Sequence, residues 1–138
     1  MAREHDESMM NNLYWWGVQT LFRCPHIQIT DPNLGNHDIA LIGVPHSAGN
    51  GTTERDQHLG PRAVRHMSAV QRRVHGEFNF DPFAAKKIID AGDVPFPRAN
   101  DNEDCIAQIT SFYKDIDEAG LRPVSIGGDH SITGGIVQ

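Results

Sequence analysis

The sequence has few cysteines and no long apolar run. Its two cysteines, Cys24 and Cys105, lie far apart and neither has a CxxC partner. This spacing argues against a disulfide framework or a zinc knuckle and favours reduced thiols. No apolar run approaches the ~18 residues that span a bilayer, and the first ten residues are mostly polar. We therefore expect a cytoplasmic protein without a membrane partner.

The sequence also lacks a cluster of basic residues. Twelve Lys and Arg stand against eighteen Asp and Glu, which gives a net charge of −6 at pH 7. A surface that follows a nucleic-acid backbone needs clustered positive charge, so nucleic acid is not an expected partner. Apolar residues make up 38% of the 138-residue chain, against roughly 45–50% in globular proteins. The length fits one domain, but the composition leaves open whether the chain completes a core alone.

Residues 1–36 are predicted to form an N-terminal arm that serves oligomer or domain packing. The arm carries two adjacent tryptophans, Trp15 and Trp16, and contains a turn at Asp31–Gly35. Adjacent tryptophans point in different directions, so at least one is expected to pack beyond its own element. The arm either covers its own domain or docks on a neighbouring subunit, where aromatic anchors are enriched. The sequence favours neither alternative.

Residues 37–138 are predicted to alternate strands and helices. The apolar run Ile39–Val44 is typical of a strand buried in a parallel sheet. Further strands are expected at Lys87–Ala91 and at Val124–Ile126. This order predicts an α/β domain with a parallel sheet.

Helices are expected between these strands and after the last one. Gly60 opens the first helix, with proline in the favoured first position. Asn100 or Asp101 caps the second helix, which carries one apolar stripe and stops at Gly120. Ser131 starts the third helix.

The segments that follow the three strands are expected to share one rim of the sheet. Right-handed crossovers point the strands in the same direction, so their carboxyl ends lie together. The loops Pro45–Leu59, Gly92–Asn100 and Gly127–His130 therefore converge. Ligands of open α/β sheets bind at this rim, which makes the three loops the candidate site.

The first loop is long for a strand-to-helix connection, where about two to six residues is usual, and we interpret it as a substrate lid. Asn50 and Glu54 are its candidate substrate-binding residues, and Arg55, His46 and His58 could also contact a polar ligand. For any single one of these residues a structural role is favoured, although the loop as a whole is interpreted as functional. In that case Glu54 pairs with Arg55, and both histidines are solvated.

The other two loops carry carboxylates and a histidine. Asp90 and Asp93 could bind a hard cation, but bonds to nearby amides that hold the turn are favoured. His130 follows paired glycines at the end of the third strand, and a neutral imidazole there could bind a transition metal. Asp129 either orients a neighbouring ligand or bonds to the backbone. The residues alone indicate a metal or small-molecule site.

Four motifs occur in the order found in one known family. They are Gly43–Pro45, Leu59–Arg65 (Leu-Gly-Pro-Arg-Ala-Val-Arg), Asp90–Asp93 (Asp-Ala-Gly-Asp) and Ile126–Ser131 (Ile-Gly-Gly-Asp-His-Ser). Together they resemble the N-terminal half of the ureohydrolase (arginase/agmatinase) family. The resemblance covers about residues 38–138, and the arm is more similar to the agmatinase-type branch.

The resemblance implies a three-layer α/β/α fold and a metal-dependent hydrolase. The family cleaves a guanidino group to urea and an amine through a hydroxide that bridges two divalent ions, usually manganese and in some relatives nickel. It implies that His130 is a metal ligand and that Asp129 supports the site from behind. It also implies a small-molecule guanidino substrate and a homo-oligomer, either a trimer or a hexamer.

The sequence departs from the family in lacking its two carboxylate-rich metal motifs, Asp-x-His-x-Asp and Ser-x-Asp-x-Asp-x-x-Asp-Pro. His130 alone cannot hold two metals, so the catalytic residues are expected beyond residue 138 and the chain alone is expected to be inactive. We interpret it as the N-terminal part of a longer enzyme. The alternative is a non-catalytic subunit that supports an active homologue in a hetero-oligomer. A free-standing α/β binding module is disfavoured because its third strand would leave an open sheet edge.

The sequence does not identify the substrate. Agmatine, guanidinobutyrate, guanidinopropionate and guanidine differ in the tail beyond the reacting carbon. Much of the pocket that would contact this tail is expected outside these 138 residues.

Overall fold

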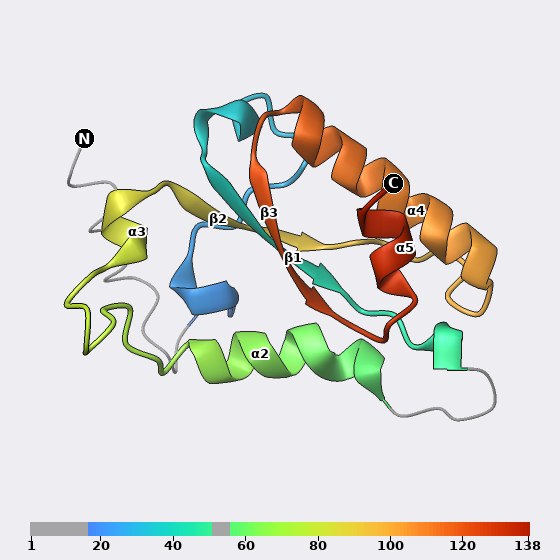
Figure 1. The fold of residues 1–138 in the computed structure, drawn as a ribbon, viewed down its shortest axis with the longest axis horizontal. Coiled ribbons are helices and arrows are strands. Elements are labelled where there is room, and N and C mark those ends of the chain that lie inside the picture. Colours follow the sequence, from blue (N-terminus) through green and yellow to red (C-terminus); the bar gives the residue numbers. More distant parts are fainter. Residues whose placement is uncertain (1–16, 51–55) are drawn as a thin grey trace.

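The computed structural model describes residues 17–50 and 56–138. Its centre is a parallel sheet with the strand order β2-β1-β3. The strands are β1 (Ile39–Val44), β2 (Ile88–Asp93) and β3 (Arg122–Gly127), close to the predicted ranges. Figure 1 shows helix α2 (Gly60–Ser68) on one face of the sheet and helices α4 and α5 on the other. The predicted α/β/α layering with a parallel sheet is confirmed.

Side chains alternate across β1 and build a core on each face of the sheet. Ala40, Ile42 and Val44 are buried in the larger cluster, which includes the apolar side of α4. Leu41 belongs to a smaller cluster on the other face, against which Val64 of α2 packs. The central strand is therefore covered on both sides, as its unbroken apolar run predicts.

Helix α4 (Asn102–Glu118) has the predicted limits. Asp101 is its N-cap and accepts a hydrogen bond from the backbone N–H of Asp104 at 3.0 Å. The chain turns away at Gly120, where φ is +80°. One stripe of the helix is buried against the sheet and comprises Cys105, Ile109, Phe112, Tyr113 and Ile116. The other side is polar, and no helix in the described part of the chain is long and apolar enough to cross a membrane.

The last helix, α5 (Ile132–Ile136), begins after Ser131 as predicted and packs against α4. The contact is close, because a Cβ at Gly135 would lie 2.9 Å from the Cβ of Ile109. Glycine therefore permits the two helices to approach. This packing sets the position of the Gly127–Ser131 turn that precedes α5.

Sequence periodicity missed the short elements. Helix α3 (Pro82–Ala85) has four residues, and the 3₁₀ turns η1 (Leu21–Arg23), η2 (Leu34–Asn36), η3 (Ala48–Asn50) and η4 (Gln57–Leu59) have three each. Such lengths are too short to show a helical repeat. Local chemistry explains α3, since Asp81 accepts a hydrogen bond from the Phe83 N–H at 2.9 Å and proline occupies the first helical position.

The described part of the N-terminal arm, residues 17–36, lies along β2. Leu21 and Cys24 are buried in the smaller core cluster with Leu41 and Ile88. Trp15 and Trp16, on which the docking alternative depended, lie outside the described residues. The arm therefore contributes to the core of its own domain, and its role towards a neighbouring subunit stays a prediction.

Candidate active site

The three rim loops meet at His46, which follows β1. His46 is 2% exposed, and its Nε2 lies 2.9 Å from the Oδ1 of Asn102 at the start of α4. Its ring packs against Phe96 in the loop after β2, with ring centroids 5.4 Å apart. Its backbone carbonyl accepts a hydrogen bond from the N–H of Asp129, after β3, at 2.9 Å. The convergence of the loops predicted from the parallel direction of the strands is confirmed.

Asp129 ties the third loop to the first. Its Oδ2 accepts a hydrogen bond from the N–H of Gly49 at 2.9 Å. Its Oδ1 accepts from the N–H of Ser131 at 2.9 Å and from the Ser131 hydroxyl at 2.6 Å. The carboxylate is 7% exposed, so both oxygens are used to hold backbone, which was one of the two predicted alternatives.

The loops approach so closely that glycine is required. Gly128 has a φ of +86°, and a Cβ there would collide with the carbonyl oxygen of Val44. A Cβ at Gly49 would likewise collide with the side chain of Ser131. Since these contacts are with backbone or with a short, hydrogen-bonded side chain, larger residues would push the loops apart.

His130 stands at the exposed side of this cluster. Its ring makes no hydrogen bond to any described residue, and only its backbone carbonyl is engaged, by the N–H of Thr133 at 3.3 Å. It lines an open pocket of ≈ 540 Å³ formed by the Gly127–His130 loop, the start of α5 and Gln57. An exposed imidazole on a braced loop has the chemistry of a metal ligand or a general acid–base.

His130 offers one ligand and does not form a metal centre by itself. Within residues 17–50 and 56–138, no three His, Cys, Asp or Glu side chains come together in a way that could hold a metal ion. A four- to six-coordinate cation needs several such donors. The described residues therefore fit one position of a metal centre, and further donors have to come from elsewhere.

Asp90 bonds to the backbone amide of Gly92, as the sequence favoured, but Asp90 and Asp93 are held mainly by an arginine that sequence analysis missed. Arg65 of α2 donates to both oxygens of Asp90 at 2.9 Å, and to Asp93 at 2.6 Å. Asp90 also accepts from the N–H groups of Gly92 and Leu21, each at 2.8 Å. Both oxygens of Asp90 are therefore occupied, and Asp93 is paired through its Oδ1 with Arg65.

The environment of Asp90 alters its acidity. Burial alone would raise the pKa of Asp90, but the hydrogen bonds from Arg65 and from two backbone N–H groups, with the charge of Arg65, hold it below the usual 3.8. The hydrogen bond to Asp90 is the main cause that raises the pKa of Arg65 above its ordinary value, and Asp93 adds to it. The pair therefore stays charged at neutral pH.

The remaining candidates of the first loop have mixed outcomes. Glu54 and Arg55 lie outside the described residues, and the structure places Asn50 at the end of η3 without describing its side chain. The expectation that His46 is solvated is wrong, because the ring is buried between α4 and Phe96. His58 lies 3.1 Å from the Ser47 hydroxyl through its Nδ1. No local signal marks His46, since its partner Asn102 is 56 residues away.

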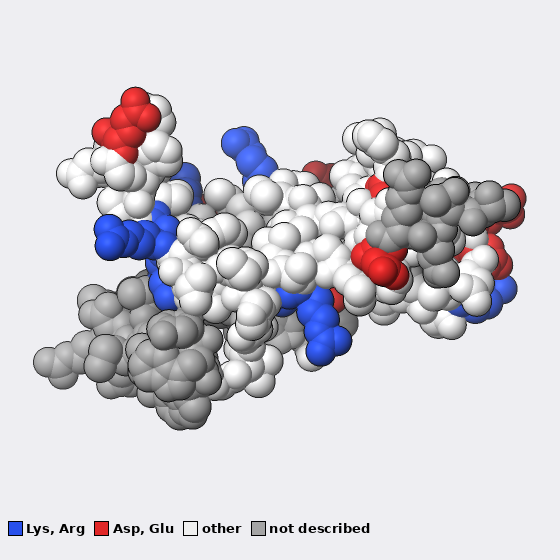
Figure 2. All heavy atoms as spheres, turned by 90° about the horizontal axis from the view of Figure 1, so that it is seen from below, with Lys and Arg blue, Asp and Glu red and all other residues white. Residues whose placement is uncertain are grey.

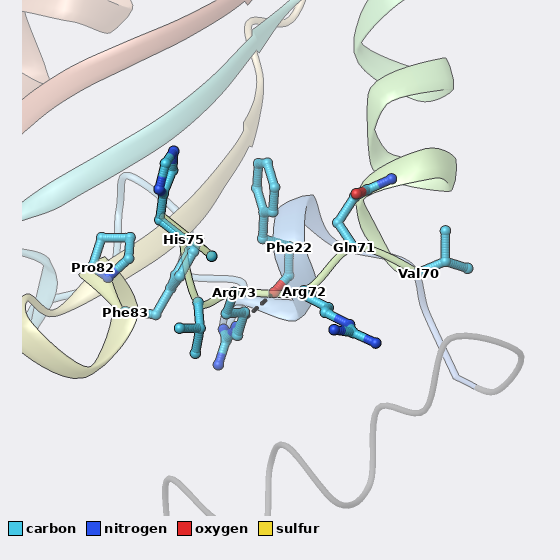
Figure 3. A pocket seen from close by; sticks show the side chains of 10 residues that line it. Phe22, Val70, Gln71, Arg72, Arg73, His75, Pro82 and Phe83 are labelled. Carbon is cyan, nitrogen blue, oxygen red and sulfur yellow. Dashed lines mark hydrogen bonds between the residues drawn. The ribbon is translucent and has the colours of Figure 1, made fainter. Parts of the chain in front are cut away.

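A second pocket, of ≈ 740 Å³, lies apart from the rim between η1, the segment after α2 and α3 (Figure 3). The Arg73 guanidinium lies 4.5 Å from the centroid of the Phe83 ring, and its Nε donates to the Phe22 carbonyl at 3.2 Å. These contacts use Arg73 to hold the segment in place. None of the rim residues lines this pocket, so it is not part of the candidate site.

The face seen in Figure 2 carries no continuous basic surface among the described residues. Its Lys and Arg side chains stand in separate places, with neutral side chains between them.

Comparison with known proteins points to one family. A profile described as the arginase family matches residues 37–138. Guanidinopropionase of Pseudomonas aeruginosa is 36% identical over 117 residues, which are 85% of this chain and 35% of that protein. Mitochondrial agmatinase of Gallus gallus is 34% identical over 123 residues, which are 88% of this chain and 34% of that protein.

The fold has the same relatives. The crystal structure of a hypothetical agmatinase from Burkholderia thailandensis superposes with a TM-score of 0.76 at 30% identity. The match covers 89% of this chain and 37% of that one. The chain thus spans about a third of the length of the curated relatives that it matches.

Proposed function

This chain belongs to the arginase family, and we propose that it is the N-terminal part of a metal-dependent ureohydrolase that cleaves a guanidino compound to urea and an amine. The observation that carries the proposal is the placement of His130. Its ring is exposed on a loop braced by Asp129, at the carboxyl ends of the strands where α/β enzymes bind ligands. Relatives named for guanidino substrates match most of the chain.

In this proposal His130 would coordinate one of two divalent ions, manganese or nickel, through a ring nitrogen. Such ions, when bound, generate a strong nucleophile from water at neutral pH. That chemistry is needed because the guanidinium carbon is stabilised by resonance. Asp129 acts behind His130 by fixing the loop backbone through Gly49 and Ser131. The other ligands and the catalytic residues lie beyond the 138 residues.

The first loop is proposed to contact the substrate. A carboxylate at Glu54 and an amide at Asn50 suit a cationic guanidinium and a polar tail. We expect Asn50→Ala and Glu54→Ala to change the ranking of agmatine, guanidinobutyrate, guanidinopropionate and guanidine as substrates in urea-release assays. An unchanged ranking in both variants would contradict the lid interpretation.

The first experiment is to purify the protein from its source and to measure its intact mass, metal content and urea release on one sample. We expect a mass well above the 15.3 kDa of these residues, two metal ions per chain and urea from one guanidino compound. The variant His130→Ala should lose bound metal, whereas His66→Ala, at an exposed position of α2, should keep it. Full metal occupancy in His130→Ala would rule out the ligand assignment.

A second candidate function is a non-catalytic subunit that supports an active homologue. It is favoured by the absence of a complete ligand set among the described residues. A mass of 15.3 kDa without metal would support this candidate and direct the search to the partner. Oligomeric state, choice of metal and cytoplasmic location stay predictions from the sequence.

A further inference from the structure

We propose that His46 and Asn102 form a positioning pair, in which the hydrogen bond between them sets the place of His130 through Asp129. The inference rests on the proposed function in so far as His130 is taken to bind metal. His46 itself is buried and does not reach the rim pocket. Its role is therefore to position, not to contact substrate or metal.

The pair is anchored in the core of the domain. Asn102 is the first residue of α4, a helix of 17 residues whose apolar stripe packs on the sheet. The amide oxygen of Asn102 can only accept, so Nε2 of His46 donates in this arrangement. Phe96 closes one side of the ring, and the backbone N–H of His46 donates to the Val44 carbonyl at 2.9 Å. The ring is thus fixed from three directions.

A single hydrogen bond connects His46 to the third loop. The His46 carbonyl accepts the N–H of Asp129 at 2.9 Å, and Asp129 directly precedes His130. On the other side of His130, Ser131 is held by both its N–H and its hydroxyl to Asp129. The residues flanking His130 are therefore tied to the His46 backbone through Asp129.

Burying the polar ring of His46 costs desolvation energy that an apolar residue would not. The partly buried hydrogen bond to Asn102 offsets this cost and also specifies a single geometry. An apolar side chain at position 46 would fill the space but would leave the carbonyl that holds Asp129 free to shift. Displacements of about 1 Å matter at a catalytic centre, so the pair is placed where geometry matters most.

The test separates the hydrogen bond from the ring. His46→Phe keeps an aromatic ring against Phe96 and loses the donor, whereas His46→Gln keeps an amide N–H near the place of Nε2. Asn102→Ala removes the acceptor at an exposed helix position, so it is expected to fold even where a change at the buried His46 does not. His66→Phe, at an exposed position of α2, is the matched control.

The first readout is the metal dissociation constant, measured in the complete protein that contains this chain. Changes behind a metal ligand cost roughly 10–100-fold in affinity, and since His46 acts one residue further away we expect the lower end, about tenfold, for His46→Phe and for Asn102→Ala. Because they break the same bond, the double variant should lose no more than either single variant. His46→Gln should recover most of the affinity. Wild-type affinity in both single variants, or losses that add, would overturn the proposal.

The second readout needs no metal. Amide hydrogen exchange at Asp129 and Ser131 should be faster in His46→Phe and Asn102→Ala, while the amides of Ile109–Ile116 in α4 exchange at the wild-type rate. Unchanged exchange rates at Asp129 and Ser131 in both variants would refute the positioning role of His46 and Asn102. If the wild-type protein binds no metal but the exchange rates rise as expected, the proposed function fails and the positioning pair stands.

Discussion

The two outer strands of the sheet, β2 and β3, occupy equivalent positions beside β1 but differ in how far their residues are buried. In β2 the residues Ile88–Ala91 are buried, whereas in β3 the residues Arg122–Ser125 are exposed. The cause is the chain segment before β1. Asp90 donates its N–H to the Pro25 carbonyl at 2.9 Å and accepts from the Ile27 N–H at 3.1 Å. None of the strands in residues 17–50 or 56–138 pairs with the outer edge of β3.

The difference shows that burial of an outer strand depends on what is added beside it. An outer strand with free N–H and C=O groups is a template for pairing with another strand. On the β2 side the backbone of the arm takes up this pairing, whereas on the β3 side no strand in the described part of the chain does so. The two edges should therefore respond differently to mutation.

The largest effect is expected from Asp90→Ala, which removes the side-chain bonds that hold Leu21 and Arg65 against β2. The change leaves Arg65 without its bidentate partner and frees the Leu21 N–H. Removing one member of a buried pair costs about 3–5 kcal/mol, measured as a loss in the free energy of unfolding in urea. Asp93→Ala is the control, because the Asp93 side chain is 41% exposed and exposed pairs contribute at most about 1 kcal/mol. Equal losses in the two variants would refute the comparison.

The same pair predicts how stability depends on pH. Because the pKa of folded Asp90 lies below 3.8, its contribution is complete above the unfolded pKa and is lost as the pH falls through the folded value. The stability difference between wild type and Asp90→Ala should therefore be constant near neutral pH and shrink below pH 3.8. Unfolding curves at several pH values measure it, and a constant difference into acid would exclude the assignment.

Leu21→Ala tests the packing of the N-terminal arm against β2 by a change in the arm itself. Leu21 is fully buried with Leu41 and Ile88, and a truncation of this kind costs about 2–5 kcal/mol, depending on how far the cavity collapses. We expect the lower half of this range, because the cluster is small. Val18→Ala, at an 85% exposed position, should change stability little, and a similar loss at both positions would contradict the packing.

The smallest effect on stability is expected on the β3 side, from Val124→Lys. Val124 is 47% exposed, and exposed substitutions usually stay within about 0.5 kcal/mol. The variant should nevertheless reduce self-association of the 138-residue chain in sedimentation experiments, because charge opposes edge pairing. If the wild-type chain associates and Val124→Lys associates to the same extent, β3 is not the contact.

Sequence analysis recovered what local patterns encode. The strand β1 follows from an apolar run, and the start of α4 from the Asp101 cap. The placement of His130 at the rim also follows, because parallel strands end on the same side.

What sequence analysis missed depends on contacts between distant residues. Arg65 and Asp90 are 25 positions apart, and His46 and Asn102 are 56 apart. No spacing rule links such residues, since their contact exists only once two loops and a helix are in place. Sequence patterns therefore predict a solvated side chain for a histidine that follows a buried strand, and only the fold shows which residues cover it.

The central position of β1 also affects when the domain can fold during synthesis. Ile39 pairs with Ile88 on one side and with Arg122 on the other. The apolar strand therefore leaves the ribosome long before either partner, and at translation rates of about 5–20 residues per second it waits several seconds for both. Long loop closures of this kind slow folding. A nascent chain of this protein is thus expected to expose β1 to chaperones until the segment that carries His130 has been made.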